Sequence, residues 1–328
     1  MKRREFITLL GGAAATWSLA ARAQQPAKPV VGVVGGQSFD ADKSNVVAFH
    51  KGLNETGYVD GQNVTVEYHW LDGQYDRAPA LMADLVRRRV AVIATTGSVV
   101  AALAAKAATT TIPVVFGVPE DPVRLGLVAS LARPGGNATG INFFFSEVLA
   151  KRLQLLHDFV PKAVRVAVLV NPANATTAEP TLQEVNKAAP TIGLQIQILN
   201  ATTIDEIDAA FASLAREHSD ALFVTNDAFF TSRRAQLATL AMRGRIPAIY
   251  SNRDFVAAGG LTSYGTNLAE TTRQIGVYTG TILKGANPAE LPVLQSTKFE
   301  FVINLQTARA LGIEVPSGLL STADEVIE

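Results

Sequence analysis

Six short segments rich in serine, threonine, asparagine and aspartate follow apolar runs, and their side chains could do chemistry. They read GGQSFDAD, TTGS, GVPEDPV, NPANATT, TNDAFF and YSNRDF. Hydroxyl, amide and carboxylate groups of this kind cap helices, and they also hold the polar groups of small molecules. For each of these residues, a capping role and a ligand-binding role therefore both stay open.

Catalytic and metal-binding patterns are not evident. Ser98 follows a strand, as in a nucleophile elbow, but Val99 and Val100 come next and G-x-S-x-G is not satisfied. The sequence has no cysteine, which excludes thiol catalysis and disulfides. None of the histidines shows a metal-ligand spacing such as H-E-x-x-H; they are His50, His69, His157 and His218. We therefore expect no metal and no catalytic residue.

Nucleotide cofactors are also not indicated. The segment after the first apolar run, Gly32 to Gln37, does not match G-x-G-x-x-G, and no G-x-x-x-x-G-K-[ST] occurs. A dinucleotide site needs an acidic residue at the end of the second strand, where this sequence has His69 and Trp70. The expected set of cofactors is empty.

The elements that must position these segments alternate between strands and helices. PVVGVVGG, NVTVEYHW, VAVIATTG and IPVVFGV are predicted strands, with helices over 42–55, in YDRAPALMADLVRRR and VVAALAAKAAT, and after DPV. The pattern restarts at AVRVAVLVNPAN, and the two units join near GGNATGINFFF. Strands that are apolar nearly throughout and separated by helices indicate parallel sheets covered on both faces. The predicted class is therefore α/β, with two doubly wound lobes.

Two helices of the second unit illustrate the pattern. We expect one to begin at about Glu179, with Pro180 in its first turn, where proline is tolerated. Another lies in TIDEIDAAFASLAREH, where apolar residues recur at three- and four-residue spacing. These residues are Ile204, Ile207, Phe211 and Leu214.

Aromatic residues gather in or beside the polar segments. They are Phe39, Phe116, Phe143, Phe144, Phe145, Phe229, Phe230, Tyr250, Phe255 and Tyr264. They could pack between the two units, but we favour a pocket walled by some of them. The six segments contain several acidic residues but only one arginine, Arg253. This balance disfavours multiply charged anions and favours a zwitterion or an amine-bearing aromatic ligand.

The N-terminus reads MKRREFITLLGGAAATWSLAARAQQP, which has the charged region, apolar region and Ala-x-Ala site of a signal peptide. We expect residues 1–23 to be removed near Ala23 and the product to lie in the periplasm. RREFI matches a twin-arginine signal, although an ordinary signal peptide is the alternative. Cleavage would leave 25 basic and 28 acidic residues, a net charge of −3, which argues against a nucleic-acid partner.

Several segments resemble the ABC-transporter substrate-binding proteins of the periplasmic type, with a type I binding-protein fold, a family that includes binders of aromatic amino acids. They are AALAAKAATTTIPVVFGVPEDPVRLGLVASLARPGGNATGI, GGLTSYGTNLAE, ILKGANPAELPV and FEFVINLQTARALGIEVPSGLLSTADEVIE. The resemblance extends from about residue 30 to the C-terminus. It implies a monomer without enzyme activity that binds a small amino-acid-like or aromatic carboxylate ligand and delivers it to a membrane permease.

The resemblance also implies two lobes joined by three crossings, with the ligand between them. The first lobe would comprise 28–140 plus 252–294 and the second 141–251 plus 295–328, with crossings near Asn142, Ser251 and Lys298. Hinge closure around the ligand would follow from contacts with both lobes. Two alternatives stay open, a periplasmic sensor that presents its ligand to a receptor and an exported hydrolase.

Roles for individual residues follow as hypotheses. Thr96 and Ser98 would hold the ligand's carboxylate at a helix start. Asp227, or alternatively Glu120, would pair with its ammonium group. Donors from the facing lobe would be Asn174, Thr176 and Thr177. The aromatic walls would be Phe39, Phe229 and Tyr264. Further polar contacts would come from Gln37, Ser38 and Asn142. A capping or packing role stays open for each.

Overall fold

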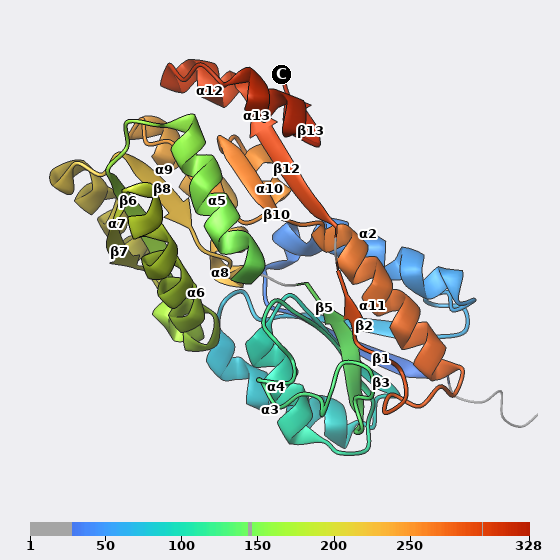
Figure 1. The fold of residues 1–328 in the computed structure, drawn as a ribbon. Coiled ribbons are helices and arrows are strands. Elements are labelled where there is room, and N and C mark those ends of the chain that lie inside the picture. Colours follow the sequence, from blue (N-terminus) through green and yellow to red (C-terminus); the bar gives the residue numbers. More distant parts are fainter. Residues whose placement is uncertain (1–27, 144–145, 297) are drawn as a thin grey trace, which may run out of the picture.

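Two β-sheets, each with helices on both faces, divide the described residues into two lobes (Figure 1). The computed structural model describes residues 28–143, 146–296 and 298–328. The predicted signal peptide, residues 1–23, lies outside the described residues, and so do Phe144 and Phe145. The predicted fold class, two doubly wound α/β lobes, is confirmed.

The sheet of the first lobe is parallel in the described residues. Its strands, in spatial order, are β2 (Thr65–Trp70), β1 (Val30–Gly35), β3 (Val92–Thr96), β4 (Val114–Val118), β5 (Ala138–Asn142) and β11 (Leu294–Gln295). Two apolar clusters form its core, one on each face. One face carries α3 (Ala78–Arg87) and α4 (Val99–Ala108), and the other carries α2 (Phe39–Glu55) and α11 (Leu268–Leu283).

The sheet of the second lobe contains one antiparallel pair, β10 with β12, among otherwise parallel described strands. Its strands, in spatial order, are β7 (Gln195–Asn200), β6 (Arg165–Val170), β8 (Ala221–Val224), β9 (Ala248–Tyr250), β10 (Thr262–Thr266), β12 (Phe299–Asn304) and β13 (Glu325–Ile327). Its helices are α5 (Ser146–Phe159), α6 (Ala175–Ala188), α7 (Ile204–Glu217), α8 (Ala228–Ser232), α9 (Arg234–Arg243), α10 (Arg253–Ala257), α12 (Leu305–Leu311) and α13 (Ser317–Thr322). α5 and α6 pack on one face, and α7 to α10 pack on the other.

One predicted lobe boundary differs from the structure. Residues 252–294 were expected in the first lobe, but β10 pairs with β9 and β12 in the second sheet. The second crossing therefore follows β10 and does not lie near Ser251. The cause is the pairing of β10 with β12, a strand more than thirty residues further along the chain. α11 and β11, which come after the crossing, do pack in the first lobe.

The crossings between the lobes are hydrogen-bonded to one another. The hydroxyl of Thr266, at the end of β10, donates to the main-chain oxygen of Phe143 (2.9 Å). The amide of Ser296, after β11, donates to the main-chain oxygen of Asn142 (2.8 Å). These bonds connect the crossing segments to one another.

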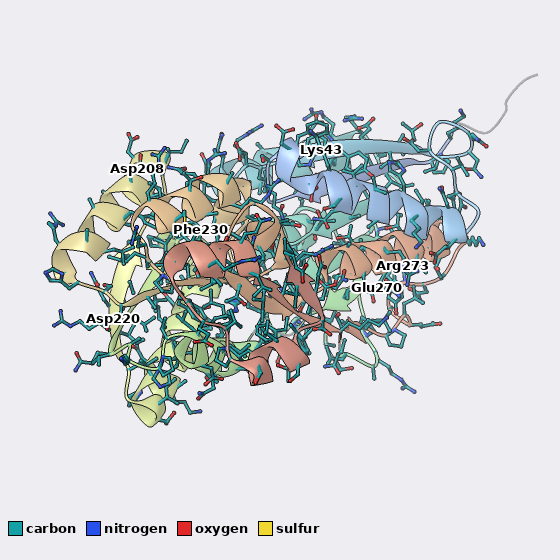
Figure 2. All side chains as sticks on the ribbon, turned by 90° about the horizontal axis from the view of Figure 1, so that it is seen from above. Lys43, Asp208, Asp220, Phe230, Glu270 and Arg273 are labelled. Carbon is teal, nitrogen blue, oxygen red and sulfur yellow. The ribbon has the colours of Figure 1, made fainter. Side chains whose placement is uncertain are left out.

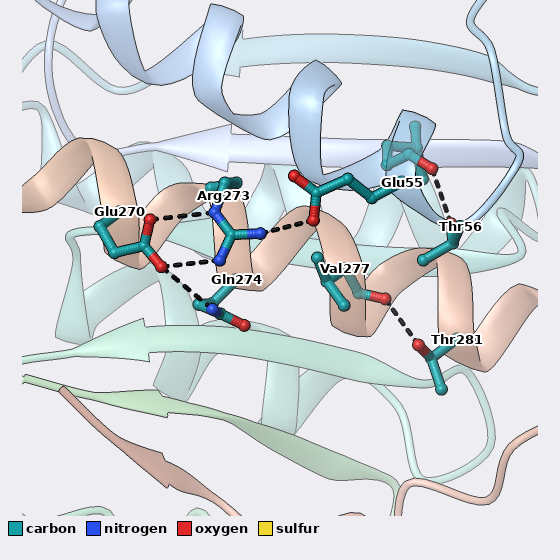
Figure 3. Close-up of polar contacts among 8 residues, drawn as sticks. Glu55, Thr56, Glu270, Arg273, Gln274, Val277 and Thr281 are labelled. Atoms are coloured by element: carbon teal, nitrogen blue, oxygen red, sulfur yellow. Dashed lines mark hydrogen bonds and ion pairs between the residues drawn. The ribbon is translucent and has the colours of Figure 1, made fainter.

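The first lobe is held together on one face by close contact between α2 and α11. A Cβ atom added to Gly52 of α2 would lie 1.8 Å from the main-chain oxygen of Arg273 in α11, so only glycine permits this approach. The guanidinium of Arg273 donates to Glu270 of the same helix and to Glu55 of α2 (Figure 3). The hydrogen bond from Arg273 lowers the pKa of Glu270 to about 2.

The loops that follow the parallel strands meet between the two lobes. The loop after β2 contacts the loop after β8, and the loop after β4 shares a cavity with the start of α6. Seen from above, Asp208, Asp220 and Phe230 mark the second lobe, while Lys43, Glu270 and Arg273 mark the first (Figure 2). Ligands of open parallel sheets bind at such strand ends, so the candidate site lies where these loops face each other.

Candidate ligand-binding site

A cavity of about 410 Å³ lies between the lobes. The first lobe contributes the loop after β4, and the second contributes the beginnings of α5 and α6. The lining residues are Pro119, Glu120, Asp121, Arg124, Leu125, Leu149, Ala175, Thr176, Thr177, Glu179, Pro180 and Thr181. The volume lies within the range of small-molecule sites, and the mixture of apolar and polar walls is typical of them.

Three of the predicted site residues line this cavity, namely Glu120, Thr176 and Thr177. Asn142 lies beside it, because its side-chain amide donates to the main-chain oxygens of Glu120 (2.7 Å) and Val118 (3.1 Å). The Asn142 bonds therefore fix the loop that carries Glu120.

Glu120 has the most perturbed environment of the lining residues. Both of its carboxylate oxygens are buried, and the structure gives them no hydrogen bond. Burial raises the pKa of Glu120 to about 7, and the nearby charge of Asp227 also raises it, while the hydroxyl of Thr177 acts in the opposite direction. A buried carboxylate that is approached by the Thr177 hydroxyl and has no ion pair among the described residues favours a ligand that brings its own cation.

The first turn of α6 forms the opposite wall. The helix begins at Ala175 and not at about Glu179 as predicted, so Pro180 lies in its second turn. Because proline has no N–H, the main-chain oxygen of Thr176 lacks its usual helical partner. Asn174 occupies the N-cap position without capping the helix through its side chain, whose amide instead donates to Asp227 (2.9 Å). The uncapped amides of this turn can receive an anionic group.

Sequence reasoning missed Arg124, an exposed residue that also lines the cavity. A helix was expected after DPV, but residues 121–127 form turns, with hydrogen bonds from the Leu125 amide to Asp121 and from Leu127 to Pro122. Gly126, at φ +72°, ends this stretch in a conformation unsuited to a helix. That glycine is the signal that a loop continues past DPV and includes Arg124. Arg253 instead pairs with Glu325 (2.6 Å), away from the cavity.

Other predicted residues lie where the lobes touch directly. The amide of Ser38 donates to the hydroxyl of Ser232 in the second lobe (2.8 Å). The Ser98 hydroxyl caps α4 by accepting from the Ala101 amide (3.2 Å), which is the alternative role left open for it. Gln37 and Thr96 are buried, and their side-chain oxygens have no hydrogen bond in the structure. None of these four predicted residues lines the cavity.

Asp227 is engaged by the protein itself. Its carboxylate accepts from the Tyr75 hydroxyl (2.8 Å), from the side-chain amides of Asn171 and Asn174 (2.9 Å each), and from the Phe229 main-chain amide (3.0 Å). A carboxylate offers about four lone-pair sites, so no site remains for a ligand. Between the two predicted ammonium partners, the geometry therefore favours Glu120.

The three predicted aromatic walls do not face the cavity. Phe39 is 53% exposed and contacts the edge of Trp70. Phe229 packs in the core of the second lobe, and Tyr264 stacks on Phe299 in the second sheet. The apolar lining among the described residues is instead aliphatic: Pro119, Leu125, Leu149, Ala175 and Pro180.

Two further features bear on what the site can do. Within residues 28–143, 146–296 and 298–328, no three metal-ligating side chains cluster. In the same part of the chain, every helix is too short or too polar to cross a bilayer.

Known proteins resemble both the sequence and the structure. The tyrosine-binding protein of Clostridioides difficile (strain R20291) is 27% identical over 266 residues, which cover 81% of this chain and 76% of that protein. The crystal structure of an ABC domain in complex with L-Trp from Streptococcus pneumonia has a TM-score of 0.81 at 25% identity, covering 92% of this chain and 100% of that chain. The ligand-free, open structure of a substrate-binding protein with adhesive properties from Clostridium difficile has a TM-score of 0.64 at 25% identity, covering 92% and 99%.

The TM-score of this structure is thus higher with the complex with L-Trp than with the ligand-free, open protein. The neighbours share the type I fold of periplasmic binding proteins, which confirms the predicted architecture. The family model described as ABC transporter substrate binding protein matches residues 29–327. The chain belongs to the family of ABC transporter substrate-binding proteins.

Proposed function

We propose that this protein binds a small amino acid with an apolar side chain between its lobes and delivers it, unchanged, to a membrane permease. The observation that carries the proposal is the buried carboxylate of Glu120 in the wall of an interlobe cavity, which has no ion pair among the described residues. A primary ammonium group has three donors and a positive charge, so it satisfies such a carboxylate better than a neutral ligand does.

The carboxylate of a zwitterionic ligand has two candidate partners in the same cavity. The first turn of α6 offers main-chain amides and the hydroxyls of Thr176 and Thr177, and the guanidinium of Arg124 lies in the facing loop. Leu125 and Leu149 supply apolar surface for the side chain. An amino acid in this cavity therefore contacts both lobes.

Contact with both lobes couples binding to hinge closure, because the ligand gains the second set of contacts only when the lobes close. Turning a mostly open population into a mostly closed one requires a preference of roughly 5 kcal/mol for the closed state. Hydrogen bonds to charged groups contribute about 1.5–3 kcal/mol each, so the ammonium and carboxylate contacts together suffice.

The relatives support an amino acid as the ligand class, since one is named a tyrosine-binding protein and another was solved with L-Trp. The predicted signal peptide supports export to the periplasm, and the family supports a permease as the partner. The aliphatic lining extends the candidate ligands to L-leucine as well as the aromatic amino acids.

A thermal-shift screen tests the proposal. The compounds are L-tryptophan, L-tyrosine, L-leucine, tryptamine, which lacks the carboxylate, and indole-3-propionate, which lacks the amine. A ligand at 100 times its Kd stabilises the folded protein by about 2.7 kcal/mol. We expect at least one L-amino acid to raise Tm and indole-3-propionate to leave it unchanged. Stabilisation by indole-3-propionate but by no amino acid, or chemical conversion of the bound compound detected by mass spectrometry, contradicts the proposal.

A further inference from the structure

The two lobes also contact each other at a place separate from the cavity. The loop after β2, residues 72–75, lies against α8 and against Asp227, which precedes this helix. The central contact is the hydrogen bond from the Tyr75 hydroxyl of the first lobe to the Asp227 carboxylate of the second (2.8 Å). Neither residue lines the cavity.

Asp227 is held rigidly in the second lobe. Asn171 and Asn174 donate one side-chain hydrogen bond each to its two oxygens (2.9 Å), and the Phe229 amide donates a further one (3.0 Å). These three donors come from the second lobe alone, so they hold the carboxylate in place whether or not the lobes are closed. The fourth acceptor position faces the first lobe.

Tyr75 is held equally firmly in the first lobe. Its ring is only 8% exposed and belongs to the apolar cluster that includes Leu71 and Met82. Burial raises the pKa of Tyr75 well above its ordinary value, and the charge of Asp227 adds to the rise. The hydroxyl therefore stays protonated and can donate to the carboxylate.

Two flanking contacts place the same surfaces together. A Cβ atom added to Gly73 would lie 2.8 Å from the Cβ of Phe229, so the loop and α8 are in close contact. Next to them, the guanidinium of Arg233 lies 3.5 Å from the Asp72 carboxylate and over the ring of Phe229. Both contacts join the first lobe to the second.

We propose that the hydrogen bond between Tyr75 and Asp227 is an interlobe latch, which favours the closed arrangement without touching the ligand. The affinity of a ligand for a closing protein is its intrinsic affinity reduced by the fraction of molecules that are competent to bind. Loss of the latch should therefore lower the affinity for every ligand by the same factor. Only this part of the proposal rests on the proposed function, because closure itself can be measured without any ligand.

The first test measures lobe distance in the ligand-free protein. Because the sequence has no cysteine, Arg87→Cys in α3 and Lys187→Cys in α6, two exposed positions, provide the labelling sites for a donor and an acceptor dye. Tyr75→Phe removes the latch hydroxyl and keeps the buried ring. Tyr58→Phe is the matched control, since its hydroxyl donates to the main-chain oxygen of Leu283 (2.9 Å) within the first lobe.

We expect Tyr75→Phe to shift the single-molecule distance distribution towards the open population by about tenfold, the effect of losing one hydrogen bond to a charged group. Tyr58→Phe should leave the distribution as in the unmodified protein. Asp227→Asn is the second variant, because it weakens the same bond from the other lobe, and it should open the lobes too. Unchanged distributions in both latch variants overturn the proposal.

The second test measures affinity by isothermal titration with L-tryptophan and L-leucine. We expect Tyr75→Phe to raise the apparent Kd of each ligand that binds by the same factor as it lowers the closed population. A change confined to one ligand would show that the hydroxyl contacts that ligand directly and would overturn a latch role. If neither amino acid binds the unmodified protein, the proposed function fails, and the distance measurement alone decides on the latch.

Discussion

Replacement of Glu120 by glutamine should make the ligand-free protein more stable while weakening amino-acid binding. The carboxylate pays a desolvation penalty in the cavity wall that a neutral amide avoids. The rise of its pKa from 4.5 to about 7 corresponds to about 3 kcal/mol against the ionised form at pH 8. This value is an upper bound, since opening of the lobes would return the carboxylate to water.

The sign of the pH dependence follows from the raised pKa. The penalty is present in full above pH 7, where Glu120 is ionised in both the folded and the unfolded chain. It shrinks as the pH falls from about 7 to 4.5, because the folded state takes up the proton first, and it vanishes below that range. The stability gained by Glu120→Gln should therefore be about 3 kcal/mol at pH 8 and about 1 kcal/mol at pH 5.

Urea unfolding of the ligand-free protein at the two pH values measures this gain, and titration with an L-amino acid measures binding. Glu179→Gln is the matched control, because Glu179 lines the same cavity but is exposed on α6. We expect Glu120→Gln to weaken binding at pH 8 about 30-fold, or about 2 kcal/mol, through loss of the ammonium contact. A Glu120→Gln protein that is less stable at pH 8, or a gain that does not depend on pH, would refute the reasoning.

Three further predictions concern other parts of the molecule. Arg124→Gln should raise the Kd of amino acids about tenfold, as measured by calorimetry. The Kd of tryptamine, which has no carboxylate, should not change. Gly52→Ala should lower the free energy of unfolding by about 3 kcal/mol or more in urea, because the added Cβ meets main chain of α11 at 1.8 Å, whereas Gly318→Ala, in open space, should be neutral. Asp42 accepts a hydrogen bond from the indole of Trp70, the only tryptophan in the described residues, and burial raises the pKa of Asp42 to about 6. The fluorescence of Trp70 should therefore change with a midpoint near pH 6. Asp42→Asn should abolish this transition.

The fold could be predicted because its signals are local. In α7, Ile207, Phe211 and Leu214 are buried as the apolar spacing predicted, and Ile204 is 47% exposed because it is the first residue of the helix. The lobe to which β10 belongs could not be predicted, because its pairing with β12 depends on a contact between distant segments. Hydrophobic periodicity indicates that a strand exists and does not indicate its neighbours.

Only some of the residues that line the candidate cavity could be predicted, for a related reason. The rule that loops after parallel strands form the site selected Glu120, Thr176 and Thr177, which line the cavity. It also selected Thr96 and Asp227, which are buried by other parts of the protein and do not line the cavity. Sequence spacing places all these loops at one edge of a sheet, but only the packing of the two lobes decides which of them border an empty space.

The order of the crossings has a consequence for how the molecule is made. The face of the first lobe next to α2 lacks its partner until α11, residues 268–283, has been synthesised. The sheet of the second lobe lacks β12 until residue 304 and β13 until residue 327 have been synthesised. Neither lobe can complete its core while residues 268–304 are still missing, so we expect the two lobes to mature together rather than one after the other. A chain truncated after residue 260 would leave both unfinished.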